Sequence, residues 1–289
     1  MSAGTGVGFQ TMATGRPEFL DMAVDMALSL RAHTDHPIAL AADSVIAERA
    51  SQRFPSVFDH VHLIPARFLH GRIRKFGCAE ASPFARTVFI DADCIVLDSL
   101  DHLFDPLASA PMAMLGELLT RSDDENHHGF STRRLMQQFD LDHYLKTNSG
   151  LFAYRDDARP IFEECRTCFL DEARPRLKRS IVLGKWLGDE IAFGIVGGRR
   201  RVSSLPLPHA MYWPQEFDSI DLDAPTKPLL HFIWPPRAKT LERLLDDIRG
   251  RRREAGLTTE GSEVWRVEAR KLQKMKRRRE WAERFGLWG

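Results

Sequence analysis

The sequence lacks the features that mark non-globular classes of protein. Only 4 of its 289 residues are cysteine, and its 19 glycines and 16 prolines are ordinary numbers for a chain of this length. These counts exclude a disulfide scaffold, a collagen-like repeat and a chain that is disordered throughout. No apolar run approaches the roughly 20 residues that a membrane-spanning helix needs. The chain is long enough to bury a real core, as one large α/β domain or two small ones.

An excess of charge of one sign is also missing. The 41 Lys and Arg residues nearly balance the 40 Asp and Glu residues, and the formal net charge is +1. A chain-wide positive field that would attract nucleic acid is therefore not expected. The first ten residues have neither a basic start nor an apolar stretch of signal-peptide length. We expect a cytoplasmic protein without a nucleic-acid partner.

Two of the cysteines, Cys165 and Cys168, form a C-x-x-C pattern inside an apparently helical stretch. No second pair follows at the spacing of a zinc ribbon. We therefore expect reduced structural thiols and not a metal or redox site, which a measurement of bound zinc would check.

Short apolar runs alternate with helical patterns in the first half of the chain. This alternation predicts βαβ units and a largely parallel sheet. The strands are expected at 7–11, 38–42, 61–64 and 87–90, and the helices at 17–30, 45–54 and 72–81.

The second half is less regular. Strands are expected at 112–115, 148–154 and 229–233, and helices from about 158 and over 187–196. The polar segment 117–130 between them is interpreted as a long loop, and long loops inside compact domains are usually functional or disordered.

The C-terminal segment differs in kind from the rest. Residues 265–285 hold nine basic and three acidic side chains. Trp265, Ala269, Leu272 and Met275 fall on one helical face. Such a helix could lie on an anionic membrane surface, or it could pack on the domain with its charges in solvent. We divide the chain into a domain at 1–245 and a basic helical extension at 246–289, of which 262–289 would make any membrane contact.

The sharpest local pattern is Asp91-Ala92-Asp93, placed between two apolar runs. Side chains at i and i+2 of an extended segment point the same way. Two carboxylates so close repel each other, which raises one pKa unless a cation lies between them. Mn²⁺ or Mg²⁺ would suit these oxygen ligands. Ligands of open α/β sheets bind beyond the carboxyl ends of strands, so we predict a metal site here.

With four further features, the sequence resembles glycosyltransferase family 8, the glycogenin and lipopolysaccharide galactosyltransferase type. The resemblance runs from about residue 6 to residue 239 and leaves the tail outside. It implies an α/β fold of the GT-A type: a single Rossmann-like domain with a mostly parallel sheet. The four features are Lys75, Asn148-Ser149-Gly150, Asp189-Glu190 and His231-Phe232.

The resemblance also implies roles for individual residues. Asp91, Asp93 and His231 match metal ligands for Mn²⁺ or Mg²⁺. The residues implied in binding the donor are Gln10, Thr11, Lys75, Asp91, Ser149, Gly150, Arg237 and Lys239. The resemblance also implies that Asp189, Glu190 and Asn148 orient the sugar or stabilise the positive charge that develops on it.

Three positions depart from the family pattern. Glu190 stands where the family usually has Gln, and Gly194 where it often has Asn. Trp234 replaces the Gly of the motif H-F-x-G-x-x-K. Arg237 replaces the Lys of that motif and keeps its charge, because a guanidinium can clamp a phosphate.

The resemblance implies the transfer of a hexose, with retention at the anomeric carbon, from a nucleotide-diphosphate sugar that is a UDP-sugar in the family. The acceptor could be a glycan, a lipid or a protein. No dedicated general base is expected, because the departing phosphate oxygen can take the acceptor proton. Segments 117–130 and 209–217 are the candidates for lining the acceptor site.

Two alternatives stay open. A haloacid-dehalogenase-type phosphatase also begins with an apolar strand and D-x-D. It usually has Thr or Val two places after the second Asp, where this chain has Ile95. The other alternative is a non-catalytic scaffold of the nucleotide-sugar fold, which the substitutions Glu190 and Trp234 motivate.

Overall fold

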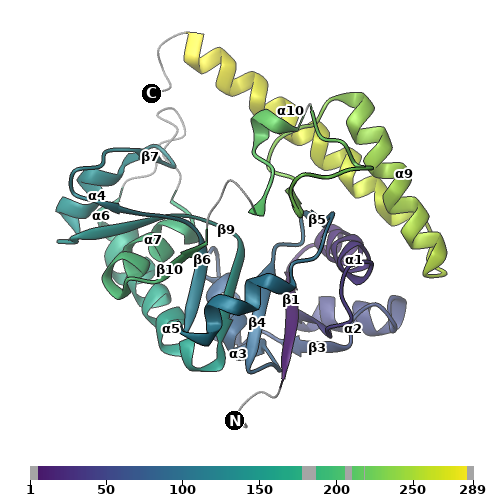
Figure 1. Ribbon diagram of the computed structural model, residues 1–289, viewed down its shortest axis with the longest axis horizontal. Helices are drawn as coiled ribbons and strands as arrows, with labels where there is room; N and C mark the ends of the chain where they lie inside the picture. The colour runs from purple at the N-terminus through teal and green to yellow at the C-terminus, as the bar shows by residue number, and fades with distance from the viewer. Residues whose placement is uncertain (1–5, 178–186, 206–209, 218, 285–289) are drawn as a thin grey trace.

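A seven-stranded sheet with helices on both faces forms the centre of the protein (Figure 1). The computed structural model describes residues 6–177, 187–205, 210–217 and 219–284. The strand order is β10-β6-β9-β4-β1-β2-β3. The strands are β1 (Val7–Ala13), β2 (Ile38–Ala42), β3 (His60–Leu63), β4 (Arg86–Ile90), β6 (Met112–Thr120), β9 (His143–Arg155) and β10 (Ser203–Leu205).

The sheet is mostly parallel, as the βαβ pattern predicts. β1 pairs in parallel with β2 and β4, β2 with β3, and β10 with β6. β9 is the exception, because it runs antiparallel between β4 and β6. All five residues of β2 are buried, which explains its continuous apolar sequence.

The helices of the first half lie where the periodicity predicts them. α1 (Pro17–Arg31) begins at Pro17, where a missing N–H costs little. α2 (Ser44–Arg53) is capped by Asp43, whose Oδ1 accepts from the Ile46 backbone N–H at 3.0 Å. The predicted helix at 72–81 is a 3₁₀ turn, η2 (Arg74–Gly77), followed by α3 (Cys78–Ala81).

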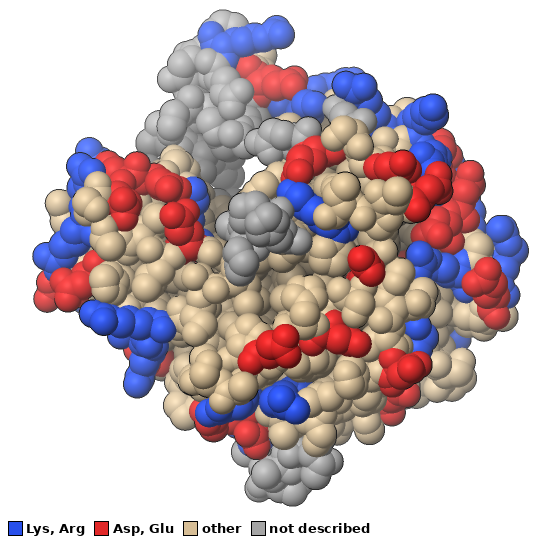
Figure 2. Space-filling view, in the orientation of Figure 1, with Lys and Arg blue, Asp and Glu red and all other residues tan. Residues whose placement is uncertain are grey.

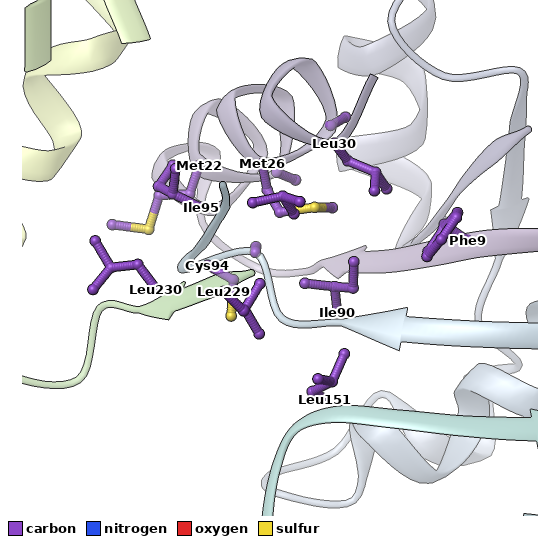
Figure 3. Packing of buried hydrophobic residues seen from close by; sticks show 14 of the residues in the cluster. Phe9, Met22, Met26, Leu30, Ile90, Cys94, Ile95, Leu151, Leu229 and Leu230 are labelled. Atoms are coloured by element: carbon purple, nitrogen blue, oxygen red, sulfur yellow. The ribbon is translucent and has the colours of Figure 1, made fainter. Parts of the chain in front are cut away.

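Two apolar cores flank the sheet. The first lies between the sheet and α1, and it also receives β5 (Cys94–Val96) and β11 (Leu229–His231). Figure 3 shows the side chains from these elements that meet there: Met22, Met26, Leu30, Ile95, Leu229 and Leu230. The second core packs α5 (Arg159–Thr167) and α7 (Asp189–Arg200) on the opposite face.

The predicted long loop at 117–130 is wrong. β6 continues through Thr120 because the long strand β9 provides it with a partner, with Glu117 opposite Lys146. β7 (Asn126–His127) and β8 (Phe130–Ser131) then form a short hairpin. α4 (Thr132–Gln138) follows at once, capped by the Ser131 hydroxyl.

The C-terminal helices are part of the core packing. α9 (Ala238–Glu254) and α10 (Glu263–Arg284) lie against α1 (Figure 1). The predicted boundary between 245 and 246 falls inside α9, where Leu244 and Leu245 are fully buried. Trp265 at the start of α10 is also fully buried, whereas Met275 and Trp281 are more than half exposed. The first half of α10 therefore packs on the domain, and its second half carries exposed apolar side chains.

A buried ionic cluster fastens these helices, and we call it the clasp. It consists of Asp25, Arg252 and Trp265. Arg252 Nε lies 2.5 Å from Asp25 Oδ1, and Trp265 Nε1 donates to Asp25 Oδ2 at 2.8 Å. One acid from α1 thus holds one side chain from α9 and one from α10.

The strand that carries His231 also contacts α10. The ring of Phe232 packs edge-on against Trp265, with centroids 5.2 Å apart. Lys276 Nζ lies 5.2 Å from the ring centroid of Trp234, a cation–π distance. The Trp that replaces the expected Gly therefore has a partner in the C-terminal helix.

All four cysteines are buried free thiols, Cys165 and Cys168 included. None of the described helices is long and apolar enough to cross a membrane. Basic and acidic side chains are interleaved over the face seen in Figure 2.

Candidate active site

The two carboxylates of the D-x-D pattern lie in a turn between β4 and β5. The Cys94 backbone N–H donates to the Asp91 carbonyl at 3.1 Å, which closes the turn. The expectation that an extended segment makes them converge is therefore wrong. The turn brings the carboxylates together at the carboxyl end of β4 and lets the chain reverse into β5.

His231 reaches this turn from far along the chain. β11 pairs antiparallel with β5 and places His231 opposite Cys94. The next residue, Phe232, donates its N–H to the Asp93 carbonyl at 2.8 Å. As a result, His231 Nε2 lies 3.3 Å from Asp93 Oδ1 and 4.0 Å from Asp91 Oδ2.

Lys75 is buried behind the two acids. Its Nζ lies 2.8 Å from Asp91 Oδ2, 3.0 Å from Ser149 Oγ and 3.1 Å from the Ser149 carbonyl. These contacts account for its three N–H donors. Lys75 therefore balances Asp91 and ties it to β9, and its contact with a donor stays a prediction.

The segment Asn148-Ser149-Gly150 forms the adjoining wall. The Gly150 carbonyl accepts from the Asp91 N–H at 2.9 Å, and the Asn148 side chain accepts from the Gly150 N–H at 2.8 Å. A Cβ at Gly150 would lie 2.5 Å from His231 Cε1. Only glycine lets the imidazole approach this strand so closely.

Asp189 and Glu190 occupy the first turn of α7. Asp189 Oδ2 accepts from Ser149 Oγ at 3.1 Å and lies 3.4 Å from Lys75 Nζ. Glu190 Oε1 accepts from the Ser149 N–H at 2.8 Å, and its Oε2 pairs with His128. The sequence indicated His128 only as part of a loop that could line the acceptor site, and the two adjacent histidines were the available signal for its pairing with Glu190.

The family's Asn has no room at position 194. A Cβ on Gly194 would lie 2.5 Å from Tyr144 Cζ and 2.8 Å from the Leu145 carbonyl. α7 therefore packs on β9 through a glycine, and this departure from the family pattern follows from close packing.

Two of the predicted donor-binding residues, Gln10 and Thr11, are buried in β1. Gln10 is fully buried, and its amide accepts from the Tyr154 hydroxyl at 2.7 Å and donates to the Cys78 carbonyl at 3.2 Å. Its side chain is therefore engaged inside the second core, and its contact with a donor stays a prediction. Thr11 is also fully buried.

Arg237 and Lys239 are exposed at the start of α9, and their contact with a diphosphate stays a prediction. Lys239 lines a cavity of about 200 Å³ together with Ser219 and Arg243. Of the proposed acceptor segment 209–217, His209 lies outside the described residues. A cavity of about 450 Å³ beside α9 has none of the site residues in its lining.

Buried charges shape the protonation of the site. Burial raises the pKa of Asp91 to about 6, although Lys75 opposes the change. Burial would also raise the pKa of Asp93, but the imidazole of His231 holds it below its ordinary value. Burial would lower the pKa of His231, and the carboxylate of Asp93 instead raises it. One carboxyl of the pair thus has a raised pKa, chiefly because it is buried, and the neighbouring Asp93 carboxylate adds to the shift.

The donor atoms fit a divalent cation. Ligand atoms of Asp93, Cys94 and His231 all lie within 4.8 Å of one another, and Asp91 adjoins them. Burial raises the pKa of Cys94 well above its ordinary value, so its thiol stays protonated. The remaining set of carboxylate oxygens and one imidazole suits Mn²⁺ or Mg²⁺.

Comparisons with known proteins agree with this architecture. No protein-family model and no curated protein sequence matches the chain. Among solved structures, the galactosyltransferase LgtC in complex with donor and acceptor sugar analogs is similar, with a TM-score of 0.56 and 14% identity over 90% of this chain and 99% of that one. The glycosyltransferase GlyE of Streptococcus pneumoniae TIGR4 has a TM-score of 0.53 and 14% identity over 88% of this chain and 66% of its own.

The bifunctional glycosyltransferase WbbM is also similar, with a TM-score of 0.54 and 13% identity over 87% of this chain. This chain spans about half of WbbM, 52% of its length. At such low identity the likeness concerns the fold alone. The protein has the Rossmann-like GT-A fold of these glycosyltransferases, as predicted.

Proposed function

We propose that the protein is a metal-dependent, retaining glycosyltransferase that moves a hexose from a nucleotide-diphosphate sugar, UDP-linked, to a glycan, lipid or protein acceptor. The observation that carries the proposal is the position of His231. Its Nε2 lies 3.3 Å from Asp93, although 137 residues lie between these two in the sequence. A GT-A fold with this constellation at the carboxyl end of β4 is suited to holding a diphosphate through a cation.

Asp91, Asp93 and His231 would hold Mn²⁺ or Mg²⁺, which when bound acts as a Lewis acid on the diphosphate leaving group. Lys75 keeps Asp91 oriented and supplies a fixed positive charge close by. Such preorganised charges stabilise the negative charge that develops as the bond to the sugar breaks. Arg237 and Lys239 are proposed to meet the diphosphate from the start of α9.

The other wall of the site is proposed to face the sugar. Asp189 and Asn148 would orient it, and the Asp189 carboxylate would stabilise positive charge at the anomeric carbon. The bond from that carbon to the phosphate oxygen breaks, and a bond to the acceptor oxygen forms on the same face. The acceptor proton passes to the departing phosphate oxygen, so no dedicated general base is required.

A thermal-shift assay on the full chain tests the proposal. A ligand that binds only the folded state raises the melting temperature by mass action. UDP together with Mn²⁺ is expected to raise it more than either alone, and a panel of UDP-sugars should single out the donor. If UDP and Mn²⁺ act no better together than separately, the chain is a scaffold. Hydrolysis of p-nitrophenyl phosphate in place of UDP-sugars would favour the phosphatase alternative.

The exposed half of α10 supports a second proposal, peripheral contact with the cytoplasmic face of a membrane. Met275 and Trp281 are 56% and 58% exposed on a helix with many basic residues. Because Trp265 anchors the same helix, deleting residues 262–289 would damage the fold. Charge reversal at exposed Lys274 is therefore the sharper test, with Lys239→Glu on α9 as the control. Sedimentation with anionic vesicles should be reduced only by Lys274→Glu; equal sedimentation of both variants would contradict the proposal.

A further inference from the structure

The adjacent histidines of the β7–β8 hairpin face the first turn of α7. Ring centroids of His127 and His128 are 4.5 Å apart. Glu190 Oε2 pairs with His128 Nε2 and lies 3.9 Å from His127 Nε2. The three side chains offer ligand atoms close enough to share a metal ion, so their hydrogen bonds decide what the cluster can do.

His127 is held as a neutral imidazole. Its Nε2 lies 3.1 Å from the Thr147 carbonyl, which can only accept, so Nε2 carries the proton. Its Nδ1 then accepts from the Tyr144 hydroxyl at 2.7 Å. Burial lowers the pKa of His127 to about 4. With both nitrogens engaged, His127 has no lone pair left for a metal, and the cluster is a hydrogen-bonded support.

His128 is in the opposite situation. Its backbone adopts φ 54°, in the left-handed region, and Gly129 follows at φ 82°. This tight turn aims the imidazole at Glu190. Burial would lower the pKa of His128, but the hydrogen bond to Glu190 and its charge raise it. Burial would likewise raise the pKa of Glu190, but the bond to His128 lowers it to about 2.

We propose that His128 is a positioning residue of the donor site, whose imidazolium balances the charge of Glu190 and holds that carboxylate against Ser149. The proposal rests on the proposed function and deepens it. The reason lies in the local charge: Glu190 adds an anion next to Asp189, in a site that must also admit a diphosphate. A cation from the hairpin offsets this anion and fixes both carboxylate oxygens.

The pair makes the site sensitive to alkaline pH. Because the pKa of His128 is raised, the imidazolium is fully present below the ordinary histidine value of about 6.5 and is lost as pH rises through the folded-state pKa. Catalytic efficiency is expected to fall over that window. The charged or titratable groups that face the pair are His127 from β7, Tyr144 from β9, Asp189 from α7, Arg72 and Lys75.

The first test is an NMR titration of the histidine side chains in the full chain. His128 should titrate above free histidine in the wild type and lower in Glu190→Gln, where the carboxylate is gone. If His128 titrates at or below the value of free histidine in the wild type, the proposal is overturned. This measurement needs no sugar transfer, so it separates failure of the proposal from failure of the proposed function.

The second test follows the pH profile of Mn²⁺-dependent UDP-sugar turnover. His128→Gln should lower kcat/KM at neutral pH by about tenfold, the lower range for loss of a supporting partner. Glu190→Gln should remove the alkaline fall, and His128→Gln in that background should then cost little. His102→Gln, the same change at an exposed position, is the control. An alkaline fall that persists unchanged in Glu190→Gln would overturn the proposal.

Discussion

The proposed donor site, formed around Asp91, Asp93, Asp189, Lys75 and His231, and the clasp both bury charged side chains, but they balance them differently. In the clasp, each Asp25 oxygen has its own donor, Arg252 or Trp265, and a second carboxylate, Asp21, lies 3.4 Å from the Arg252 guanidinium. In the donor site, Asp91 and Asp189 share Lys75, and Asp93 faces His231. Burial raises the pKa of Asp25 and of Asp91 to about 6 alike, so burial alone does not distinguish the two regions.

The two regions differ in how much buried charge is left without an opposite charge beside it. Removing either charged partner from a complete buried pair leaves a charge without its match, which is a structural loss. A site with an excess of acids at a partly open position, where the Asp93 side chain is 39% exposed, would instead suit a cation. The clasp should therefore govern stability, and the donor site should govern ligand binding.

The largest effect is expected from Asp93→Ala, which should break the donor site and leave the clasp intact. Loss of a metal ligand removes several kcal/mol of charge stabilisation, so turnover should fall ~10³-fold or more. Isothermal titration calorimetry should show no Mn²⁺-dependent binding of UDP. Asp98→Ala, at an exposed position five residues on, is the control and should bind normally. Unchanged turnover in Asp93→Ala would count decisively against the site.

Arg252→Ala should break the clasp instead. It leaves Asp25 buried without its cation, which costs about 3–5 kcal/mol of unfolding free energy. Denaturant unfolding measures the loss. The neighbouring exposed Arg253→Ala should change stability by less than about 0.5 kcal/mol. If both variants unfold at the same denaturant concentration, the clasp does not hold the C-terminal helices.

Gly150→Ala should sharpen the comparison, because it should displace the proposed metal ligand His231 without removing it. The new Cβ would lie 2.5 Å from the His231 ring and should displace it. Mn²⁺ affinity should fall by about 10–100-fold, as it does when ligand orientation is disturbed. Gly250→Ala, where a Cβ meets nothing within 4 Å, is the control. The Gly250→Ala variant should gain up to about 1 kcal/mol of helix stability. Equal Mn²⁺ affinity in the two variants would contradict the prediction, because it would show that the His231 ring tolerates the methyl group at position 150.

The smallest effect is the acid dependence of Mn²⁺ binding. His231, whose pKa is raised above its ordinary value of 6.5, and Asp91, with a pKa of about 6, must each lose a proton to bind the cation. Affinity should therefore decline as pH falls through the raised pKa of His231, and more steeply below about 6, by about tenfold per pH unit for each proton displaced. Calorimetry in buffers of different ionisation enthalpy counts those protons. Binding of Mn²⁺ without proton release at pH 5.5 would mean that neither His231 nor Asp91 is a ligand.

Local patterns in the sequence predicted much of the sheet and the main ligand candidates. Runs such as 38–42 and 87–90 are strands because they are buried on both faces, which their composition already indicates. The segment 117–130 was misjudged because its strand content depends on pairing with β9. The partners of Gln10 could not be predicted because a polar residue in a strand does not reveal which face it points to; its side chain bonds Tyr154 and Cys78 of the second core.

The sequence by itself determined which residue types could hold a cation and where the short buried strands lie, because both follow from neighbouring residues along the chain. Only the tertiary structure decided that His231 meets Asp93, that His128 pairs with Glu190, and that α10 packs on α1 through Asp25. These contacts join segments far apart in the sequence. Their geometry depends on how the sheet and its two cores pack together, which no local pattern encodes.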